Sequence, residues 1–280
     1  MRVAVLGATG FVGRHLSAAL RARGDDVIEA SLREPRSAAA RVAGADAIVN
    51  LAGESLAQRW NAGVKRRIME SRTVHPAQFL DALAAIERRP KAYVTASAVG
   101  YYGTSETATF TENSPCGRDF LAQVCVAWEQ TAAKAGELGM RVAAVRCGLI
   151  LGTDGGALAK LLPLFKAGTG GRAGSGKQWY SWIHIDDAIG IYLLALERIG
   201  GAMNATAPHP VQNREFTDTL AHLLHRPAAL PAPGFMLKAA LGEGAMLVLE
   251  GQRVLPERTL REGYAFRYPA LNSALANLIY

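Results

Sequence analysis

Short apolar runs alternate with longer segments of helical spacing through the first half of the chain. The run at 2–7 ends in a glycine, and apolar residues from 11 to 24 then recur every three or four positions, which is typical of an amphipathic helix. The same alternation predicts further strands at 26–31, 45–53, 91–103 and 140–152, and helices at 62–89 and 117–136. Strands that alternate with helices predict a parallel sheet with helices on both faces.

Two features interrupt this alternation. Pro76 lies inside the helix predicted at 62–89 and either kinks or divides it. After residue 151, glycine-rich and proline-rich loops separate short elements. The segment 182–197 is expected to return to the main sheet, with Asp186 or Asp187 as the N-cap of a helix.

A glycine pattern joins the first strand to the first helix. Residues 7–13 read G-x-x-G-x-x-G, which permits a tight turn and leaves helix N-terminal N–H groups free to hold a pyrophosphate. Such a turn can be purely structural, but here a strand precedes it and a helix follows it. We therefore predict that this turn binds a dinucleotide cofactor.

The end of the second strand selects the cofactor. An acidic residue at this point would bind the ribose hydroxyls of NAD, whereas an arginine would pair with the 2′-phosphate of NADP. The chain has Ser31, Leu32 and Arg33 here, followed by Glu34. A hydroxyl and a guanidinium favour NADP (NADPH), although Arg33 as a solvated loop residue is the alternative and Glu34 leaves NAD as the less favoured cofactor.

The fold class that follows is α/β, a Rossmann-type doubly wound parallel sheet with a smaller, mixed C-terminal substrate region. We expect an NADP-binding domain at 1–150, with 182–205 returning to it. Residues 151–181 and 206–280 would form the substrate-facing region, including a small C-terminal domain at about 233–280.

Composition excludes several classes of protein. The net charge is +7, but the 31 basic residues are scattered, so nucleic acid is not an expected partner. No apolar run reaches the ~18 residues of a membrane span. The three cysteines are odd in number and wrongly spaced for a metal cluster, which indicates free thiols and no metal. Because a strand begins at residue 2, a signal peptide has no room, and cytoplasm is the expected location.

A second glycine pattern is a decoy. Residues 171–177 fit G-x-x-x-x-G-K, yet Gln178 replaces the Ser or Thr that would hold Mg²⁺. A strand-like segment follows where a phosphate-binding loop requires a helix. We expect a flexible loop over the substrate pocket instead.

Several motifs together resemble a known family. "GATGFVGRHL", "NLAGES", "SAVGYYG", "GSGKQ…SWIHIDD" and "LEGQRVLP" occur in this order and span nearly the whole chain. They resemble the extended short-chain dehydrogenase/reductase superfamily, and more narrowly its atypical epimerase-family branch, which is NAD-dependent epimerase/dehydratase-like and ends in a small conserved C-terminal domain. The resemblance implies NADP binding and a two-part architecture, but no substrate.

The resemblance also assigns positions around the cofactor. Ser31 and Arg33 would face the 2′-phosphate, and the pyrophosphate would be held by Gly7, Thr9, Gly10, Phe11, Val12 and Gly13. The remaining positions would be Leu51, Ala52 and Gly53 beside the adenosine, Arg72 near the cofactor, and the segment 148–151, including Ile150, near the nicotinamide.

The superfamily's usual catalytic pair is missing. That pair is a Tyr and a Lys four residues later, and the two positions here are Leu121 and Cys125. No Tyr-x-x-x-Lys occurs anywhere in the sequence. Both positions fall on an apolar helical stripe, which indicates packing on the sheet. No basic neighbour in sequence would activate Cys125.

Ser97 and Tyr102 are the candidate catalytic residues that survive. They follow a strand, at the edge where open parallel sheets bind ligands. Ser97 could polarise a carbonyl, and Tyr102, with a pKa near ~10, could donate a proton. Alternatively, Tyr102 and its neighbour Tyr101 pack over the cofactor. We expect an NADP(H)-dependent oxidoreductase or epimerase/dehydratase-like enzyme acting on an unknown small molecule, or else a non-catalytic NADP(H)-binding sensor or interaction protein, as a monomer or homodimer.

Overall fold

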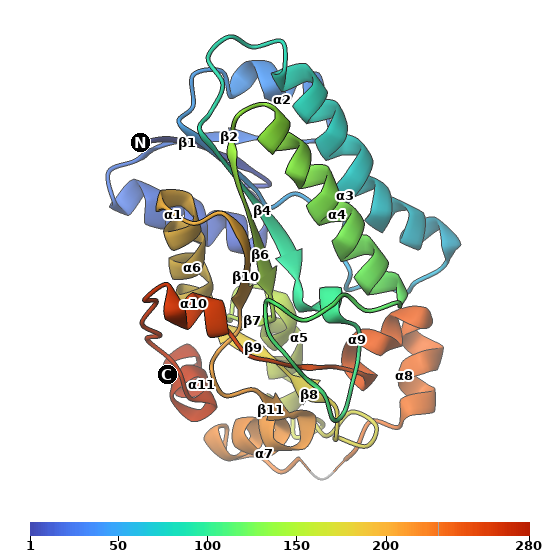
Figure 1. Ribbon diagram of the computed structural model, residues 1–280. Helices are drawn as coiled ribbons and strands as arrows, with labels where there is room; N and C mark the ends of the chain where they lie inside the picture. The colour runs from blue at the N-terminus through green and yellow to red at the C-terminus, as the bar shows by residue number, and fades with distance from the viewer. Residues whose placement is uncertain (229) are drawn as a thin grey trace.

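The computed structural model describes residues 1–228 and 230–280 of the chain (Figure 1). Its strands are β1 Arg2–Leu6, β2 Asp26–Ala30, β3 Ala47–Asn50, β4 Ala92–Ala98, β5 Thr109–Phe110, β6 Arg141–Cys147, β7 Leu149–Leu151, β8 Trp179–Tyr180, β9 Trp182–His184, β10 Gly201–Ala205, β11 Val211–Gln212 and β12 Arg253–Val254.

The longer helices belong mainly to the first two thirds of the chain. The α-helices are α1 Phe11–Ala22, α2 Pro35–Arg41, α3 Ala62–Leu83, α4 Phe120–Glu137, α5 Gly156–Lys166, α6 Ile185–Glu197, α7 Asn213–Leu223, α8 Gly234–Leu241, α9 Met246–Leu249, α10 Glu257–Arg261 and α11 Leu271–Ile279, with 3-10 helices η1 Val99–Tyr102 and η2 Glu243–Ala245.

A six-stranded sheet forms the centre of the molecule, in the order β10-β6-β4-β3-β1-β2, and every pair in it is parallel. The chain extends the sheet from β1 toward β2 and then returns to the other side of β1 with β3. The order therefore reverses between β1 and β3, and such a reversal marks the ligand-binding crevice of open α/β sheets.

Each face of the sheet is buried under helices, because side chains alternate along the strands. Val3 and Val5 point into the core shared with α1 and α6, whereas Ala4 and Leu6 point into the core shared with α2, α3 and α4. Helices cover both faces in Figure 1. Strands buried on both faces are nearly continuous apolar runs, as β1 is. The predicted fold class is thus confirmed.

Helix α3 runs uninterrupted through Pro76, so the proline does not divide it. The helix begins where the Asn61 side chain accepts a hydrogen bond from the Val64 N–H, and it ends at Leu83, before the predicted end at residue 89. Its buried positions include Ile68, Arg72 and Phe79, which brings one charged residue into the packed side of the helix.

The segment predicted as one strand at 140–152 forms two strands. β6 stays in the central sheet, while β7 pairs with β9. The chain divides at Gly148, where an added Cβ would overlap the Ser181 carbonyl oxygen. The segment 182–197 adds no strand to the central sheet: β9 pairs with β7, while Ile183 of β9 and the helix α6 pack in the core on one face of the sheet. The N-cap of α6 is His184, whose Nδ1 accepts from the Asp186 N–H at 3.1 Å, and not an Asp.

The last part of the chain is held to the sheet through two carboxylates, a buried one of Asp187 and a half-buried one of Glu112. Asp187 of α6 accepts hydrogen bonds from the Tyr264 hydroxyl and from the N–H groups of Arg267 and Tyr268. Glu112 accepts from the N–H groups of Asn204 and Arg258. Within the described residues, no helix has the length and apolar character needed to cross a membrane.

Candidate functional site

The glycine turn lies at the reversal of strand order. Gly7 has φ +84°, and the Gly10 N–H donates to the Gly7 carbonyl oxygen at 3.0 Å. A Cβ at Gly7 would lie 3.0 Å from the Ala52 nitrogen, and one at Gly13 would overlap the Gly7 oxygen. The turn is therefore packed against the end of β3, and both positions require glycine.

The N-terminus of α1 opens directly from this turn. Its N-cap is Gly10, and no side chain in the described part of the chain caps the helix. The first N–H groups of an α-helix lack partners within the helix, and they carry the positive end of its dipole. Such an end binds anions such as phosphate. Thr9 and Gly10 are exposed beside it.

The segment after β7 crosses the start of α1. Added Cβ atoms at Gly152 and Gly155 would strike the Phe11 ring, and one at Gly156 would lie 3.0 Å from the Ile150 carbonyl oxygen. Asp154 of this segment accepts hydrogen bonds from Arg14 and His15 of α1. The fold thus brings the segment of Ile150 to the glycine turn, although well over a hundred residues separate them.

The residues after β2 divide between core and surface. Leu32 is buried among α2 and β-sheet side chains, whereas Ser31 and Arg33 are exposed on either side of it. The Arg33 N–H donates to Ser31 Oγ at 3.3 Å, which holds the loop together. Within the described chain, Arg33 forms no ion pair with a carboxylate.

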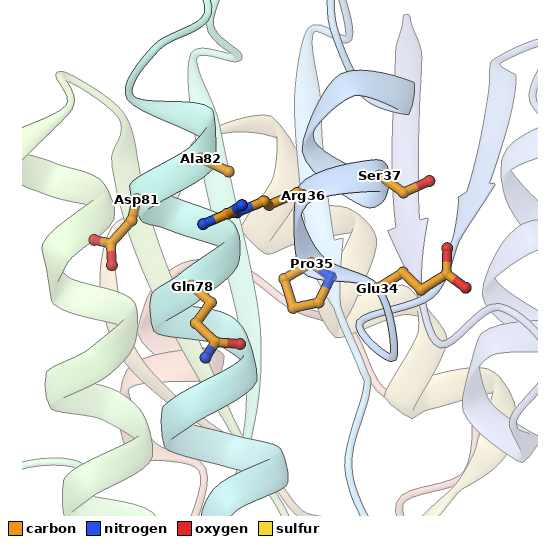
Figure 2. Close-up of a pocket in the computed structure, with 7 residues that line it drawn as sticks. All are labelled: Glu34, Pro35, Arg36, Ser37, Gln78, Asp81 and Ala82. Atoms are coloured by element: carbon orange, nitrogen blue, oxygen red, sulfur yellow. The ribbon is translucent and has the colours of Figure 1, made fainter.

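A groove of about 700 Å³ begins beside this loop and runs between α2 and α3. Figure 2 shows its lining side chains, which come from both helices and from the N-cap of α2: Glu34, Pro35, Arg36, Ser37, Gln78, Asp81 and Ala82. None of them belongs to the glycine turn. The groove therefore adjoins the β2 end of the crevice and is not the crevice itself.

Gly53 and Arg72 meet beyond the end of β3. A Cβ at Gly53 would lie 2.9 Å from Cζ of Arg72, so the guanidinium packs against the glycine. Arg72 is 8% exposed, and its Nη1 donates to the carbonyl oxygens of Glu54 and Ile68. Its guanidinium also lies 4.9 Å from the centre of the Trp128 ring.

The two positions that lack the superfamily's Tyr and Lys face the loop after β4. An added Cβ at Gly100 would lie 3.2 Å from Leu121 Cβ and 3.7 Å from Cys125 Sγ. Burial raises the pKa of the Cys125 thiol to about 12, so the sulfur stays protonated near neutral pH. Cys125 is accordingly a packing residue, as the helical stripe predicted, and not an activated nucleophile.

Ser97 and Tyr102 belong to one buried hydrogen-bond network. The Ser97 hydroxyl donates to Glu129 Oε1 at 2.6 Å, and Glu129 pairs with Arg146 at 2.8 Å. Arg146 donates to the Tyr102 hydroxyl at 3.0 Å, and this hydroxyl donates to Asn204 Oδ1 at 2.6 Å. The network joins β4, η1, α4, β6 and β10.

The burial of Tyr102 alters its acidity. Burial raises the pKa of its hydroxyl to about 12, although the charge of Arg146 acts in the opposite direction. The Arg146 guanidinium also lies 3.4 Å from the centre of the Tyr101 ring. Sequence reasoning missed Arg146 and Asn204. A signal for Arg146 existed, because it is the one charged residue inside the apolar run 142–147.

Comparison with protein families gives two matches. A family model described as "NAD dependent epimerase/dehydratase family" matches residues 3–205. A model described as "Domain of unknown function (DUF1731)" matches residues 232–278.

Comparison with curated proteins gives relatives along the whole chain. The "Epimerase family protein SDR39U1 homolog, chloroplastic" of Arabidopsis thaliana is 44% identical over 98% of this chain and 86% of its own. The "Epimerase family protein YfhF" of Bacillus subtilis is 37% identical over 100% of this chain and 98% of its own.

Solved structures show the same fold. The crystal structure of the human epimerase family protein SDR39U1 (isoform2) with NADPH superposes with a TM-score of 0.93, at 37% identity and over 99% of each chain. The UDP-glucose 4-epimerase of Thermotoga maritima superposes with a TM-score of 0.83 at 15% identity, over 99% of this chain and 97% of its own, which shows the fold alone.

Proposed function

This chain belongs to the NAD-dependent epimerase/dehydratase family, and from that membership we propose that it binds NADP(H) and acts as an oxidoreductase or epimerase/dehydratase-like enzyme on a small molecule. The observation that carries the proposal is the glycine turn at the reversal of strand order, in front of an α1 N-terminus without a side-chain cap. A dinucleotide pyrophosphate suits this geometry because the turn offers backbone N–H groups that no capping side chain of the described residues occupies.

The phosphate-binding residues would be Gly7, Thr9, Gly10, Phe11, Val12 and Gly13. Leu51, Ala52 and Gly53 would pass beside the adenosine, since the Gly7 backbone packs against this stretch. Ile150 would lie toward the nicotinamide, in the segment that Phe11 and Asp154 hold over α1.

The choice of NADP over NAD rests on the loop after β2. Because Leu32 is buried, Ser31 and Arg33 present a hydroxyl and a guanidinium at the surface next to the crevice, and the guanidinium pairs with no carboxylate of the described residues. These groups suit the 2′-phosphate, which NAD lacks. The human relative crystallised with NADPH supports this assignment.

The candidate catalytic residues are Ser97 and Tyr102. When bound, the cofactor supplies hydride exchange at nicotinamide C4. A hydroxyl with a pKa of about 12 keeps its proton at neutral pH, so Tyr102 would donate a proton and not accept one. To donate, Tyr102 would exchange its hydrogen bond to Asn204 for one to the substrate, and Ser97 would likewise leave Glu129.

The proposal is tested with the purified protein. Calorimetric titration should show NADPH binding more tightly than NADH, and a screen of carbonyl compounds and nucleotide sugars should find NADPH oxidation. Tyr102→Phe should then abolish turnover while leaving NADPH binding intact. Unchanged turnover in this variant would show that the catalytic assignment is wrong.

A non-catalytic NADP(H)-binding sensor or interaction protein is the second candidate function. The observation that favours it is the buried network, in which both candidate hydroxyls already donate to protein acceptors. NADPH binding without turnover of any screened compound would support this alternative.

We retain the proposed division of the chain into an NADP-binding part, at 1–150 and 182–205, and a substrate-facing part at 151–181 and 206–280. The small C-terminal domain at about 233–280 would close the substrate side. The choice between monomer and homodimer, and the cytoplasmic location, stay predictions.

A further inference from the structure

Helix α6 begins at a buried histidine. His184 is 2% exposed, and its Nδ1 accepts the hydrogen bond from the Asp186 N–H at 3.1 Å that caps the helix. The usual N-cap side chains are those of serine, threonine, asparagine and aspartate, none of which changes its charge between pH ~5 and ~8. The first turn of α6 therefore depends on a side chain that can titrate in this range.

The capping hydrogen bond fixes the single proton of the neutral ring. Nδ1 accepts a hydrogen bond only when it carries no proton, so the proton lies on Nε2. Nε2 is buried and has no hydrogen-bond partner among the described residues. A second proton would have to enter at Nδ1, toward which the Asp186 N–H already points.

Polar groups from three parts of the fold face the ring: Asp186 and Asp187 of α6, His15 of α1, and Tyr268 and Asn277 near the end of the chain. Burial lowers the pKa of His184, although the two carboxylates and the Asn277 side chain act in the opposite direction. A charge on His15, whose Nε2 lies 3.0 Å from Asp154 Oδ1, lowers this pKa further. The ring is therefore neutral at neutral pH and takes up a proton only in acid.

The segment 264–270, between α10 and α11, is fastened to the same turn of α6. The Asp187 carboxylate accepts from the Tyr264 hydroxyl at 3.0 Å and from the N–H groups of Arg267 and Tyr268 at 2.8 and 3.0 Å. The Tyr268 ring also stacks on the His184 ring, with 4.0 Å between their centres. His184 thus supports this segment in two ways, through the turn that carries Asp187 and through the stack.

A proton on Nδ1 conflicts with both contacts. Two N–H groups would then oppose each other at 3.1 Å, so the cap would be lost. A buried charge without a partner is costly, and Nε2 has no acceptor in the described chain. The Asp186 carboxylate, 3.9 Å from Nδ1 and 43% exposed, offers the charged ring a partner toward the solvent.

We propose that His184 is an acid-sensitive switch: protonation of its ring removes the N-cap of α6, turns the ring toward the Asp186 carboxylate and releases the segment 264–270 from Asp187. The central sheet stays folded, because apolar side chains pack on both of its faces. The switch acts on the chain itself, so it is independent of the cofactor and of any reaction.

Hydrogen–deuterium exchange read by mass spectrometry tests the switch between about pH 7.5 and about pH 5.5, with rates corrected for the pH dependence of intrinsic exchange. Protection of 264–270, which includes the Arg267 and Tyr268 N–H groups, should fall below pH ~6.5, the pKa of an unfolded histidine. The fall should be at most about tenfold per pH unit, because opening takes up one proton. Peptides from β1 and β3 should keep their protection. In His184→Asn the segment should not respond, because asparagine caps a helix without titrating.

The control is His222→Asn, which replaces an exposed histidine of α7 and should respond to pH like the wild type. Unchanged protection of 264–270 in the wild type, or an equal fall in the wild type and His184→Asn, would overturn the inference. Loss of protection across the central sheet at the same pH would overturn it too, since the chain would then unfold as a whole.

If His184→Asn does not fold, nitrogen NMR of the wild-type ring decides. The inference requires a proton on Nε2 and none on Nδ1 at neutral pH, with protonation over the same pH range in which 264–270 loses protection. A proton on Nδ1 at neutral pH, or protonation outside that range, would contradict it.

Discussion

The Tyr102 hydroxyl donates a 2.6 Å hydrogen bond to Oδ1 of Asn204, which lies 102 residues later in the chain. The bond ties η1 to β10 at the far edge of the sheet, through a region that Arg146 and Glu129 fill with opposite charges. Tyr102, which was predicted to donate a proton from a loop, therefore also stabilises the fold.

Tyr102→Phe should lower the free energy of unfolding by about 1–3 kcal/mol at neutral pH, because Asn204 and Arg146 each lose a buried partner. Urea denaturation measures this loss. Burial raises the pKa of Tyr102 in the folded state to about 12. The stability that this hydroxyl contributes is therefore fully present below pH ~10, the pKa of an unfolded tyrosine, and is lost as the pH rises through about 12. The difference in the free energy of unfolding between the wild type and Tyr102→Phe should therefore shrink as the pH rises over this range.

Tyr101→Phe is the matched control, since the Tyr101 hydroxyl has no hydrogen-bond partner in the described chain while its ring still faces Arg146. Equal destabilisation by both substitutions would contradict the role of the Tyr102 hydroxyl.

Arg33→Ala should weaken NADPH binding by about tenfold or more and leave NADH binding nearly unchanged, because a charge-assisted contact to the 2′-phosphate is lost. Fluorescence titration with NADPH and with NADH measures the ratio of their dissociation constants. Arg36→Ala is the control, as Arg36 lies in the groove between α2 and α3 (Figure 2). Equal weakening of NADPH and NADH by Arg33→Ala would rule out a 2′-phosphate contact.

Gly13→Ala should destabilise the protein by about 1–3 kcal/mol and remove most cofactor binding, because the new Cβ would overlap the Gly7 carbonyl oxygen and distort the turn. Thermal denaturation and NADPH titration report the two effects. Gly136→Ala, in α4, is the control: its added Cβ would lie 3.9 Å from the nearest side-chain atom. Normal NADPH affinity in Gly13→Ala would argue against the turn as the phosphate site.

Asp187→Asn should loosen the C-terminal segment. The carboxylate accepts from the Tyr264 hydroxyl and the Arg267 and Tyr268 N–H groups, and an amide NH₂ cannot replace both accepting oxygens. We expect a loss of about 1–3 kcal/mol and faster proteolytic cleavage after residue 250, read by mass spectrometry. The neighbouring Asp186→Asn, at a largely exposed carboxylate, should behave like the wild type.

Alkylation by iodoacetamide at pH 8 should modify Cys116 first, because that residue is exposed. Cys125 should react far more slowly, since burial raises the pKa of its thiol to about 12 and leaves about one molecule in ten thousand as thiolate. Peptide mapping at successive times measures the order in which the cysteines are alkylated. Rapid labelling of Cys125 in folded protein would contradict its packing role.

Most of the central sheet was predictable because its signals are local. The strands predicted to begin at residues 2, 26 and 45 are mainly apolar runs bounded by glycines or polar residues. In α1 the apolar residues recur with a helical period, and the buried side chains of the helix follow the same period. The errors came where a tertiary contact overrode a local pattern. Nothing in the run 140–152 shows that Gly148 must divide it, because the reason is the carbonyl of Ser181, a residue between β8 and β9.

By itself, the sequence determined the parallel sheet, the glycine turn and the absence of a Tyr-x-x-x-Lys pair, since each depends on the type and spacing of neighbouring residues. Only the tertiary structure decided that Ser97 and Tyr102 share a buried network, and that the guanidinium of Arg72 lies 4.9 Å from the centre of the Trp128 ring. Charge and burial act through space, and the residues that set them here come from strands and helices far apart in the chain.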